Sequence, residues 1–417
     1  MLAPHPALLL HGRVSISATG AVAATTLVTP APGPVRGDAG SAVTTIADGA
    51  VAWEDGVITY VGPAEGLPGA ERFEGCTIAP GFVDCHTHLP FFGWRADEFE
   101  ARLAGVSYRE LHGEGGIYRS ARMLAEASDD AVLAFCLPLV QEMAGHGTTT
   151  LELKTGYGLS VEAELRQARL ARRLTAEAPQ TCTVTLLACH AVPHGIERAA
   201  WVRTVCDELI PAAADLVDAV DVYVEDIAFS LEDLAAVAEA AAATGLPLRC
   251  HADQLAASGA AEAAVALGAR SADHLNHVSA TGISALGGAE GTVAVLLPTS
   301  TLFLRAAPPD VRGLLDAGAA VAIATDFNPG TSPVLSMPEA IATACSLYGL
   351  TPAEALVAAT ANAAAALGLA GTRGTLAPGR PADLVVLDGD AFRQVPYRPG
   401  HNAVRHTFAD GRRIGGA

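Results

Sequence analysis

Through the middle of the chain, short runs of apolar residues alternate with longer alanine-rich stretches whose apolar positions recur at helical spacing. The apolar runs predict eight strands, at residues 77–84, 147–153, 182–189, 217–225, 246–251, 270–275, 291–297 and 319–325. The intervening stretches predict helices such as 161–177, 197–213, 230–244, 256–267 and 352–367. Strands that each lead into a helix or crossover predict an α/β fold, a closed parallel (β/α)8 barrel of the TIM type. An open doubly wound sheet is the alternative, but no Gly-rich dinucleotide-binding turn favours it.

The two ends of the chain have a different pattern. Residues 1–78 carry short alternating segments, such as 57–62, interrupted by Gly, Pro and Asp, which is typical of antiparallel β-structure. Residues 372–417 repeat this pattern, with apolar runs at 382–387 and 403–408 and a turn at Asp410-Gly411. We therefore expect residues 1–78 and 372–417 to form one small β-sandwich beside a catalytic barrel of residues 79–371.

Composition narrows the functional classes. Half of the 417 residues are hydrophobic, and the formal net charge of −19 argues against nucleic-acid binding. No apolar stretch reaches the roughly 18 uninterrupted residues of a membrane span. The apolar run at residues 7–10 is too short for a signal peptide. The eight cysteines form no Cys-x-x-Cys pair, which favours free thiols in a reducing compartment. We expect a cytoplasmic protein with neither nucleic-acid nor membrane partners.

One short motif suggests metal chemistry. The first predicted barrel strand ends in Asp84-Cys85-His86-Thr87-His88. Side chains at positions i and i+2 of a strand point to the same face, so His86 and His88 can bind one divalent metal together. Taken alone, such a pair is more often two surface or core histidines.

Polar residues also end later strands, and the active sites of such barrels lie at this end. His190, His251, His274 and Asp326 each follow an apolar run. Any one of them is better explained as a capping residue, but their joint occurrence indicates a metal site. The expected ligands are His86, His88, His251 and Asp326, with one position left for water. Three imidazoles and one carboxylate suit Zn²⁺, with iron (Fe²⁺ or Fe³⁺) as the alternative.

The same residues suggest how the site would work. A metal of this kind lowers the pKa of a bound water towards about 7. Asp326 can contact both metal and water and is the expected general base, while His274 is expected to orient the water and stabilise the transition state. The fourth strand ends in Val224-Glu225-Asp226 without a lysine, which argues against a lysine-bridged two-metal site.

Longer motifs carry a family resemblance. Residues 154–159 read Lys-Thr-Gly-Tyr-Gly-Leu, and residues 324–332 read Ala-Thr-Asp-Phe-Asn-Pro-Gly-Thr-Ser. Further segments lie at 86–89, 98–103, 107–108, 147–150, 190–193, 251–254 and 271–274. The metal-site pattern resembles the amidohydrolase superfamily, and the wider sequence resembles the imidazolonepropionase family nearly from end to end. The His-x-His pair and the lone Asp326 are shared across the superfamily, whereas the two longer motifs are more particular to the family.

The resemblance implies a reaction and a substrate site. The reaction is hydrolysis of the ring amide C–N bond of 4-imidazolone-5-propanoate to N-formimino-L-glutamate, in histidine degradation. The small anionic heterocyclic substrate would be contacted by Arg95, Tyr108, Tyr157, His190, Gln254, Asn328, Gly330 and Thr331. Arg95 would bind the propionate bidentately. The implied assembly is a homodimer.

Several of these residues have structural alternatives. Arg95 could pair with Asp97 or Glu98 on a solvated loop. Tyr108 and Tyr157 could be core aromatics, and Asn328, in Asn-Pro-Gly, could be a turn residue.

Two positions depart from the family pattern. Gln254 stands where some members have glutamate; an amide cannot shuttle protons, so Gln254 should hydrogen-bond ring nitrogens and leave proton transfer to Asp326 and His274. Glu114 replaces one of three consecutive glycines in a loop expected near the substrate, which leaves the conformation of that loop open.

Two rival functions stay open on the sequence. A heterocycle deaminase of the same superfamily would normally carry a glutamate at Gln254, and it would not need Arg95 as a carboxylate anchor. A non-catalytic scaffold relative would be expected to lose metal ligands, yet every expected ligand is present.

Overall fold

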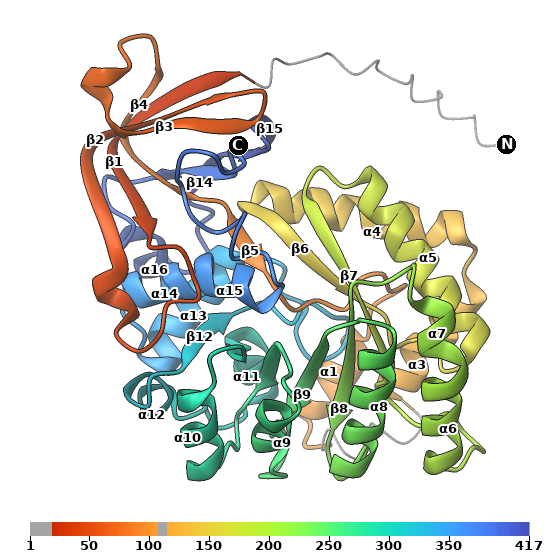
Figure 1. The fold of residues 1–417 in the computed structure, drawn as a ribbon. Helices are drawn as coiled ribbons and strands as arrows, with labels where there is room; N and C mark the ends of the chain where they lie inside the picture. Colours follow the sequence, from red (N-terminus) through yellow and green to blue (C-terminus); the bar gives the residue numbers. More distant parts are fainter. Residues whose placement is uncertain (1–18, 107–114, 417) are drawn as a thin grey trace, which may run out of the picture.

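The computed structural model describes residues 19–106 and 115–416. The larger part of the fold is built around a parallel eight-stranded sheet in the order β5 to β12 (Figure 1). The strands are β5 (Phe82–Asp84), β6 (Thr148–Lys154), β7 (Thr181–Cys189), β8 (Ala219–Val224), β9 (Leu248–Ala252), β10 (Ser271–His274), β11 (Val293–Leu296) and β12 (Ala320–Ile323). A parallel bridge between Thr87 and Phe327 joins the chain just beyond β5 to the chain just beyond β12. The two edges of the sheet therefore meet, and the predicted barrel is confirmed.

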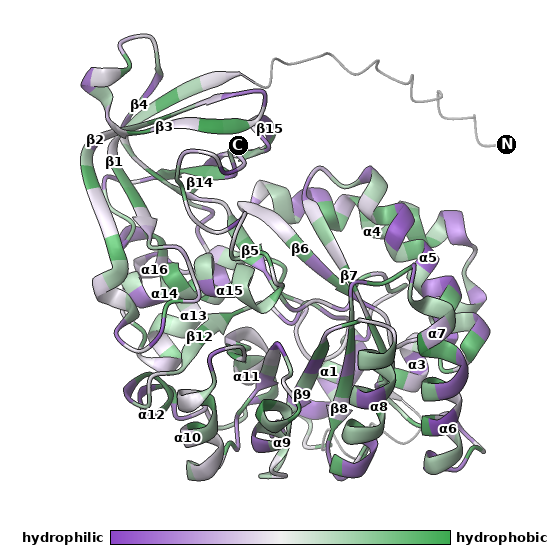
Figure 2. Cartoon of the chain, viewed as in Figure 1, coloured by the Kyte–Doolittle hydropathy of each residue, from purple (hydrophilic) through white to green (hydrophobic). Residues whose placement is uncertain are grey.

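Helices cover the outside of this barrel (Figure 1). They are α1 (Ala96–Leu103), α3 (Gly116–Glu126), α4 (Asp129–Gly145), α5 (Val161–Glu177), α6 (Arg198–Thr204), α7 (Ile210–Ala213), α8 (Leu231–Ala243), α9 (Ala260–Ala266), α10 (Ala280–Gly288), α11 (Pro298–Leu304), α12 (Val311–Asp316), α13 (Met337–Tyr348), α14 (Pro352–Ala358), α15 (Ala361–Ala366) and α16 (Gln394–Tyr397). Hydrophilic and hydrophobic residues alternate along peripheral helices such as α5 (Figure 2). Among the described residues, the membrane-span criteria of length and apolarity are met by no helix.

Two predicted helices are interrupted. The helix expected at 197–213 consists of α6, a π-helical turn (Val205–Leu209) and α7, all consecutive in the chain. The helix expected at 352–367 divides into α14 and α15 at Thr360, whose φ of −135° and ψ of −88° are not helical. Helix α5, in contrast, matches its predicted range, because Ser160 caps its first turn by accepting a hydrogen bond from the Ala163 N–H.

The chain ends build a second sheet of seven strands, in the order β15–β14–β13–β4–β1–β2–β3. Its strands are β1 (Gly20–Pro30), β2 (Val43–Glu54), β3 (Val57–Pro63), β4 (Glu71–Pro80), β13 (Leu384–Asp388), β14 (Val404–Ala409) and β15 (Arg412–Gly415). The sheet bends over on itself, so that Trp53 of β2 meets Phe408 of β14 edge to face, with ring centroids 5.5 Å apart. Alternate residues of β13 face two cores: Leu384 and Val386 face the core of this sheet, and their neighbours face the barrel.

The predicted strand 77–84 is wrong as one element. β4 of the terminal sheet ends at Pro80, and β5 of the barrel begins at Phe82. Gly81 forms the joint: its N–H donates to the Asp383 carbonyl, and a Cβ there would lie 2.2 Å from Thr149 Oγ1. The apolar pattern continues across the joint because the residues on both sides are buried, and so it conceals the change of sheet.

Candidate active site

Five polar residues that follow or end barrel strands lie together at one end of the barrel. The potential ligand atoms of His86, His88 and His251 lie within 4.8 Å of one another, as do those of His86, His274 and Asp326. Asp326 Oδ1 is 3.1 Å from His88 Nε2 and 3.7 Å from His86 Nε2. Sequence positions 240 residues apart thus form one buried cluster because parallel strands present their carboxyl ends on the same rim.

The chemistry of this cluster fits one divalent metal. Among the residues that the structure describes, His86 Nε2, His251 Nε2 and Asp326 Oδ1 are buried without a hydrogen-bond partner, although buried polar atoms are normally bonded. Burial lowers the pKa of His86 well below its usual value and also lowers the pKa of His88, which keeps both imidazoles neutral, as metal ligands must be. Burial alone would raise the pKa of Asp326, but the neighbouring imidazoles of His88 and His274 hold it below its usual value.

Two carboxylates fix the ring orientations of the candidate ligands. Asp273 Oδ2 lies 2.6 Å from Nδ1 of His86, and Asp221 Oδ1 lies 3.1 Å from Nδ1 of His251. A carboxylate on Nδ1 keeps the proton there and leaves Nε2 as the ligand atom. Both carboxylates lie behind the histidines and were not predicted.

A buried charge network supports these carboxylates. Lys154 Nζ lies 2.6 Å from Asp221 Oδ2, 3.1 Å from Glu152 Oε1 and 3.9 Å from Asp273 Oδ2. Arg249 donates to Glu152 and to the Cys85 carbonyl. The sequence alone could have indicated these network residues, because each is a charged residue inside an otherwise apolar strand.

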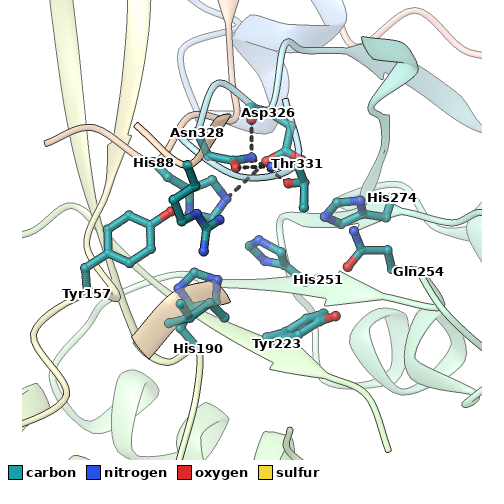
Figure 3. Close-up of a pocket in the computed structure, with 12 residues that line it drawn as sticks. His88, Tyr157, His190, Tyr223, His251, Gln254, His274, Asp326, Asn328 and Thr331 are labelled. Carbon is teal, nitrogen blue, oxygen red and sulfur yellow. Dashed lines mark hydrogen bonds and ion pairs between the residues drawn. The ribbon is translucent and has the colours of Figure 1, made fainter. Parts of the chain in front are cut away.

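Most of the predicted substrate residues line one pocket beside this cluster, and Figure 3 shows His251 between His190 on one side and His274 with Gln254 on the other. The lining residues are His88, Arg95, Ile117, Tyr157, His190, Tyr223, His251, Gln254, His274, Asp326, Asn328 and Thr331. Ile117 and Tyr223 were not predicted, since an apolar or aromatic residue in an apolar run carries no mark of a site. Tyr108 and Glu114 lie outside the described residues.

Arg95 is the cation of this pocket. Its side chain is buried, Nε lies 3.7 Å from Glu98 Oε2, and neither Nε nor Nη1 has a hydrogen-bond partner within residues 19–106 and 115–416. The guanidinium packs directly on Gly330, where a Cβ would lie 1.4 Å from Nη2. Gly330 therefore provides the space that Arg95 occupies. Two unsatisfied guanidinium N–H groups can bind a carboxylate.

The loop after β6 places Tyr157 in the wall of this pocket. Tyr157 is 2% exposed, and its ring centroid is 5.5 Å from that of His190. The His190 ring stacks on His88 at 5.2 Å and 21°, and its Nδ1 lies 3.1 Å from the Gly156 carbonyl. Tyr157 is therefore both a buried, packed aromatic residue and a residue that lines the pocket.

Asn328 organises the turn that follows Asp326. Its Oδ1 accepts from the N–H groups of Gly330 and Thr331, and its Nδ2 donates to the Asp326 carbonyl and to Thr331 Oγ1 (Figure 3). These four contacts use the hydrogen-bonding capacity of the amide, as expected for a turn residue. Direct contact between Asn328 and substrate stays a prediction.

His274 and Asp326 adopt strained backbone conformations. Their φ angles are +80° and +53°, in the left-handed region that non-glycine residues rarely occupy. Burial lowers the pKa of His274 to about 3, so its ring is neutral at neutral pH.

Comparison with known proteins agrees with this geometry. The model of the amidohydrolase family matches residues 77–414. Imidazolonepropionase of Rhizorhabdus wittichii is 44% identical over 380 residues, which cover 88% of this chain and 95% of that protein. Imidazolonepropionase of Deinococcus deserti is 43% identical over 394 residues, 93% of this chain and 97% of that protein.

Solved structures share the fold at lower identity. An adenosine deaminase from Xanthomonas campestris with bound zinc superposes with a TM-score of 0.70 at 19% identity, covering 95% of this chain and 92% of that chain. A triazine hydrolase variant gives 0.73 at 16% identity, covering 95% of each chain. These likenesses concern the fold, whereas the identity to the curated relatives extends along nearly the whole chain. The chain belongs to the amidohydrolase family and, within it, to the imidazolonepropionases.

Proposed function

We propose that this chain hydrolyses the ring amide C–N bond of 4-imidazolone-5-propanoate to N-formimino-L-glutamate, a step of histidine degradation. One observation carries the proposal: the candidate metal cluster lines the same pocket as the buried guanidinium of Arg95, whose Nε and Nη1 have no hydrogen-bond partner among the described residues. An enzyme that hydrolyses a cyclic amide with a carboxylate side chain needs both the metal site, for the amide, and the guanidinium, for the carboxylate.

His86, His88, His251 and Asp326 would hold one divalent metal, with Zn²⁺ favoured and iron as the alternative. Such an ion lowers the pKa of a bound water and polarises a carbonyl oxygen. The unpartnered Nε2 atoms of His86 and His251 and Oδ1 of Asp326 support this ligand set.

The side chains would move the protons. Asp326 accepts a proton from the water that attacks the ring carbonyl carbon, and delivers it to the ring nitrogen as the C–N bond breaks. Neutral His274 hydrogen-bonds the attacking water and steadies the charge that develops on the carbonyl oxygen. Gln254, on the same side of the pocket in Figure 3, would hydrogen-bond the ring nitrogens.

Arg95 would bind the propionate, with Tyr157, His190, Asn328 and Thr331 around the ring. We expect Arg95→Ala to raise KM roughly 10- to 100-fold with a smaller change in kcat, since a charge-assisted hydrogen bond contributes about 1.5–3 kcal/mol. Steady-state kinetics of the metal-loaded variant would measure this. An unchanged KM would place the propionate elsewhere.

Gly330→Ala tests the same anchor while keeping the charge. The added methyl group overlaps the guanidinium position, so KM should rise while metal content stays the same. Gly69→Ala is the matched control for the glycine change, because a Cβ at Gly69 meets nothing within 4 Å and its φ, like that of Gly330, lies outside the left-handed region. Gly69 precedes β4 of the terminal sheet, away from the pocket.

The decisive experiment combines metal analysis with an assay on freshly prepared 4-imidazolone-5-propanoate, followed by its ultraviolet absorbance. We expect loss of absorbance that stops on chelation, returns on adding metal, and yields formiminoglutamate without ammonia. Ammonia release would indicate a deaminase instead, and metal-loaded protein that leaves the substrate intact would refute the proposed reaction.

We also propose that the enzyme is a cytoplasmic homodimer, and that its catalytic domain comprises residues 79–371 with residues 1–78 and 372–417 as the second domain. Sedimentation of the purified protein would test the dimer.

A further inference from the structure

We propose that two buried residues of α5, Glu164 and Gln167, are positioning residues for the substrate side of the pocket, acting through the loop of residues 155–159. This inference rests on the proposed function. The two side chains lie three positions apart, on one face of the helix, and both are fully buried.

Glu164 anchors the backbone of this loop through both carboxylate oxygens. Oε2 accepts from the Gly156 N–H at 3.1 Å, and Oε1 accepts from Gly158 and Leu159 at 2.7 and 3.1 Å. Burial raises the pKa of Glu164, while the N–H donors and Thr155 oppose that shift. A buried carboxylate with three backbone donors holds a loop more firmly than neutral acceptors would.

Gln167 adds a second anchor and connects two loops of the site. Its Oε1 accepts from the N–H groups of Gly156 and Tyr157 at 3.1 and 2.9 Å, and its Nε2 donates to the Pro90 carbonyl at 2.9 Å. Pro90 lies two residues beyond His88, on the segment that leads to Arg95. Gln167 therefore ties the loop of Tyr157 to the loop that carries the proposed carboxylate anchor.

The loop of residues 155–159 is tightly packed against its neighbours. Gly156 has a φ of +114°, and a Cβ there would lie 2.7 Å from His190 Nδ1. A Cβ at Gly158 would lie 2.3 Å from the backbone nitrogen of Glu164. Movement of the loop away from α5 would therefore shift Tyr157, and with it the Gly156 carbonyl that holds His190.

The anchors act on substrate binding rather than on the metal cluster. In the described part of the chain, no hydrogen bond or ion pair joins Glu164 or Gln167 to His86, His251 or Asp326. Loosening the loop should thus raise KM while leaving metal content and most of kcat in place.

Glu164→Gln tests this directly, because the new amide NH₂ must face a backbone N–H. We expect KM to rise about tenfold, kcat to change less than about threefold, and metal content to remain that of the wild type. Amide hydrogen exchange should accelerate at residues 156–159 and not across the barrel strands. Gln167→Met, which keeps the length of the side chain and removes its hydrogen bonds without adding a buried charge, is the second variant if Glu164→Gln does not fold.

A double-mutant cycle with Tyr157→Phe separates positioning from general weakening. If Glu164 acts through Tyr157, the KM of the double variant should stay well below the product of the two single effects. Multiplicative effects, or an unchanged KM in folded Glu164→Gln protein, would overturn the proposal.

Glu354→Gln is the matched control, because Glu354 also accepts from a backbone N–H, that of Thr351, but lies in α14 outside the pocket. Wild-type protein that leaves imidazolonepropanoate intact would instead refute the proposed function.

Discussion

Asp326→Asn is expected to lower kcat about 10²- to 10⁴-fold, the usual contribution of a positioned general base. The substitution keeps the shape of the side chain and removes its capacity to accept a proton. Asp326 is 2% exposed and lines the candidate pocket, where its carboxylate can reach a bound substrate. Single-turnover kinetics of the variant would measure the loss.

Metal content must be measured on the same sample, since Asp326 is also a proposed ligand. Variant protein that retains stoichiometric metal and still turns over at a near-normal rate would remove Asp326 as the base. His274→Asn provides the comparison, because it alters a neighbouring side chain that the proposal does not use as the base.

Lys154→Met should destabilise the protein by about 3–5 kcal/mol, the cost of removing one partner from a buried ion network. Lys154 is fully buried; burial and Arg249 lower its pKa, but Asp221, Glu152 and Asp273 together hold the pKa above its usual value, so the ammonium is charged. Its loss leaves Arg249 as the cation beside Glu152 and Asp273, whereas Asp221 keeps only its contact with His251 among the described residues. Because Asp221 and Asp273 orient two proposed ligands, metal affinity should also fall about 10- to 100-fold.

Thermal unfolding and metal titration would measure both effects. Arg173→Met is the matched control: it breaks an exposed pair with Asp130, whose side chains are 47% and 91% exposed, and exposed pairs contribute about 0–1 kcal/mol. Equal behaviour of the two variants would show that the buried network supports neither stability nor the ligands.

The predictable part of this molecule is the part with a local signal. Helix α5 has a capping serine and regular apolar spacing, and the barrel strands have apolar runs that end in His or Asp. Such signals depend on residues that are neighbours in the chain, and parallel strands in a barrel carry their end residues to one rim without further information.

The unpredicted part depends on contacts between distant segments. The joint at Gly81 is invisible in an apolar run, because its two sides are buried against different sheets. Asp221 and Asp273 were visible as charges inside strands, but nothing local indicates that they contact His251 and His86.

The sequence by itself thus determined the barrel, the composite terminal β-structure and the identity of the residues at the strand ends, because periodicity and residue type are local properties. Only the tertiary structure decided which side chains are left without partners. It closed the barrel through Thr87 and Phe327, packed Arg95 onto Gly330, and used the amide of Asn328 inside its own turn. The physical reason is that hydrogen-bond satisfaction and steric fit are properties of pairs, and these pairs are brought together only when the chain folds.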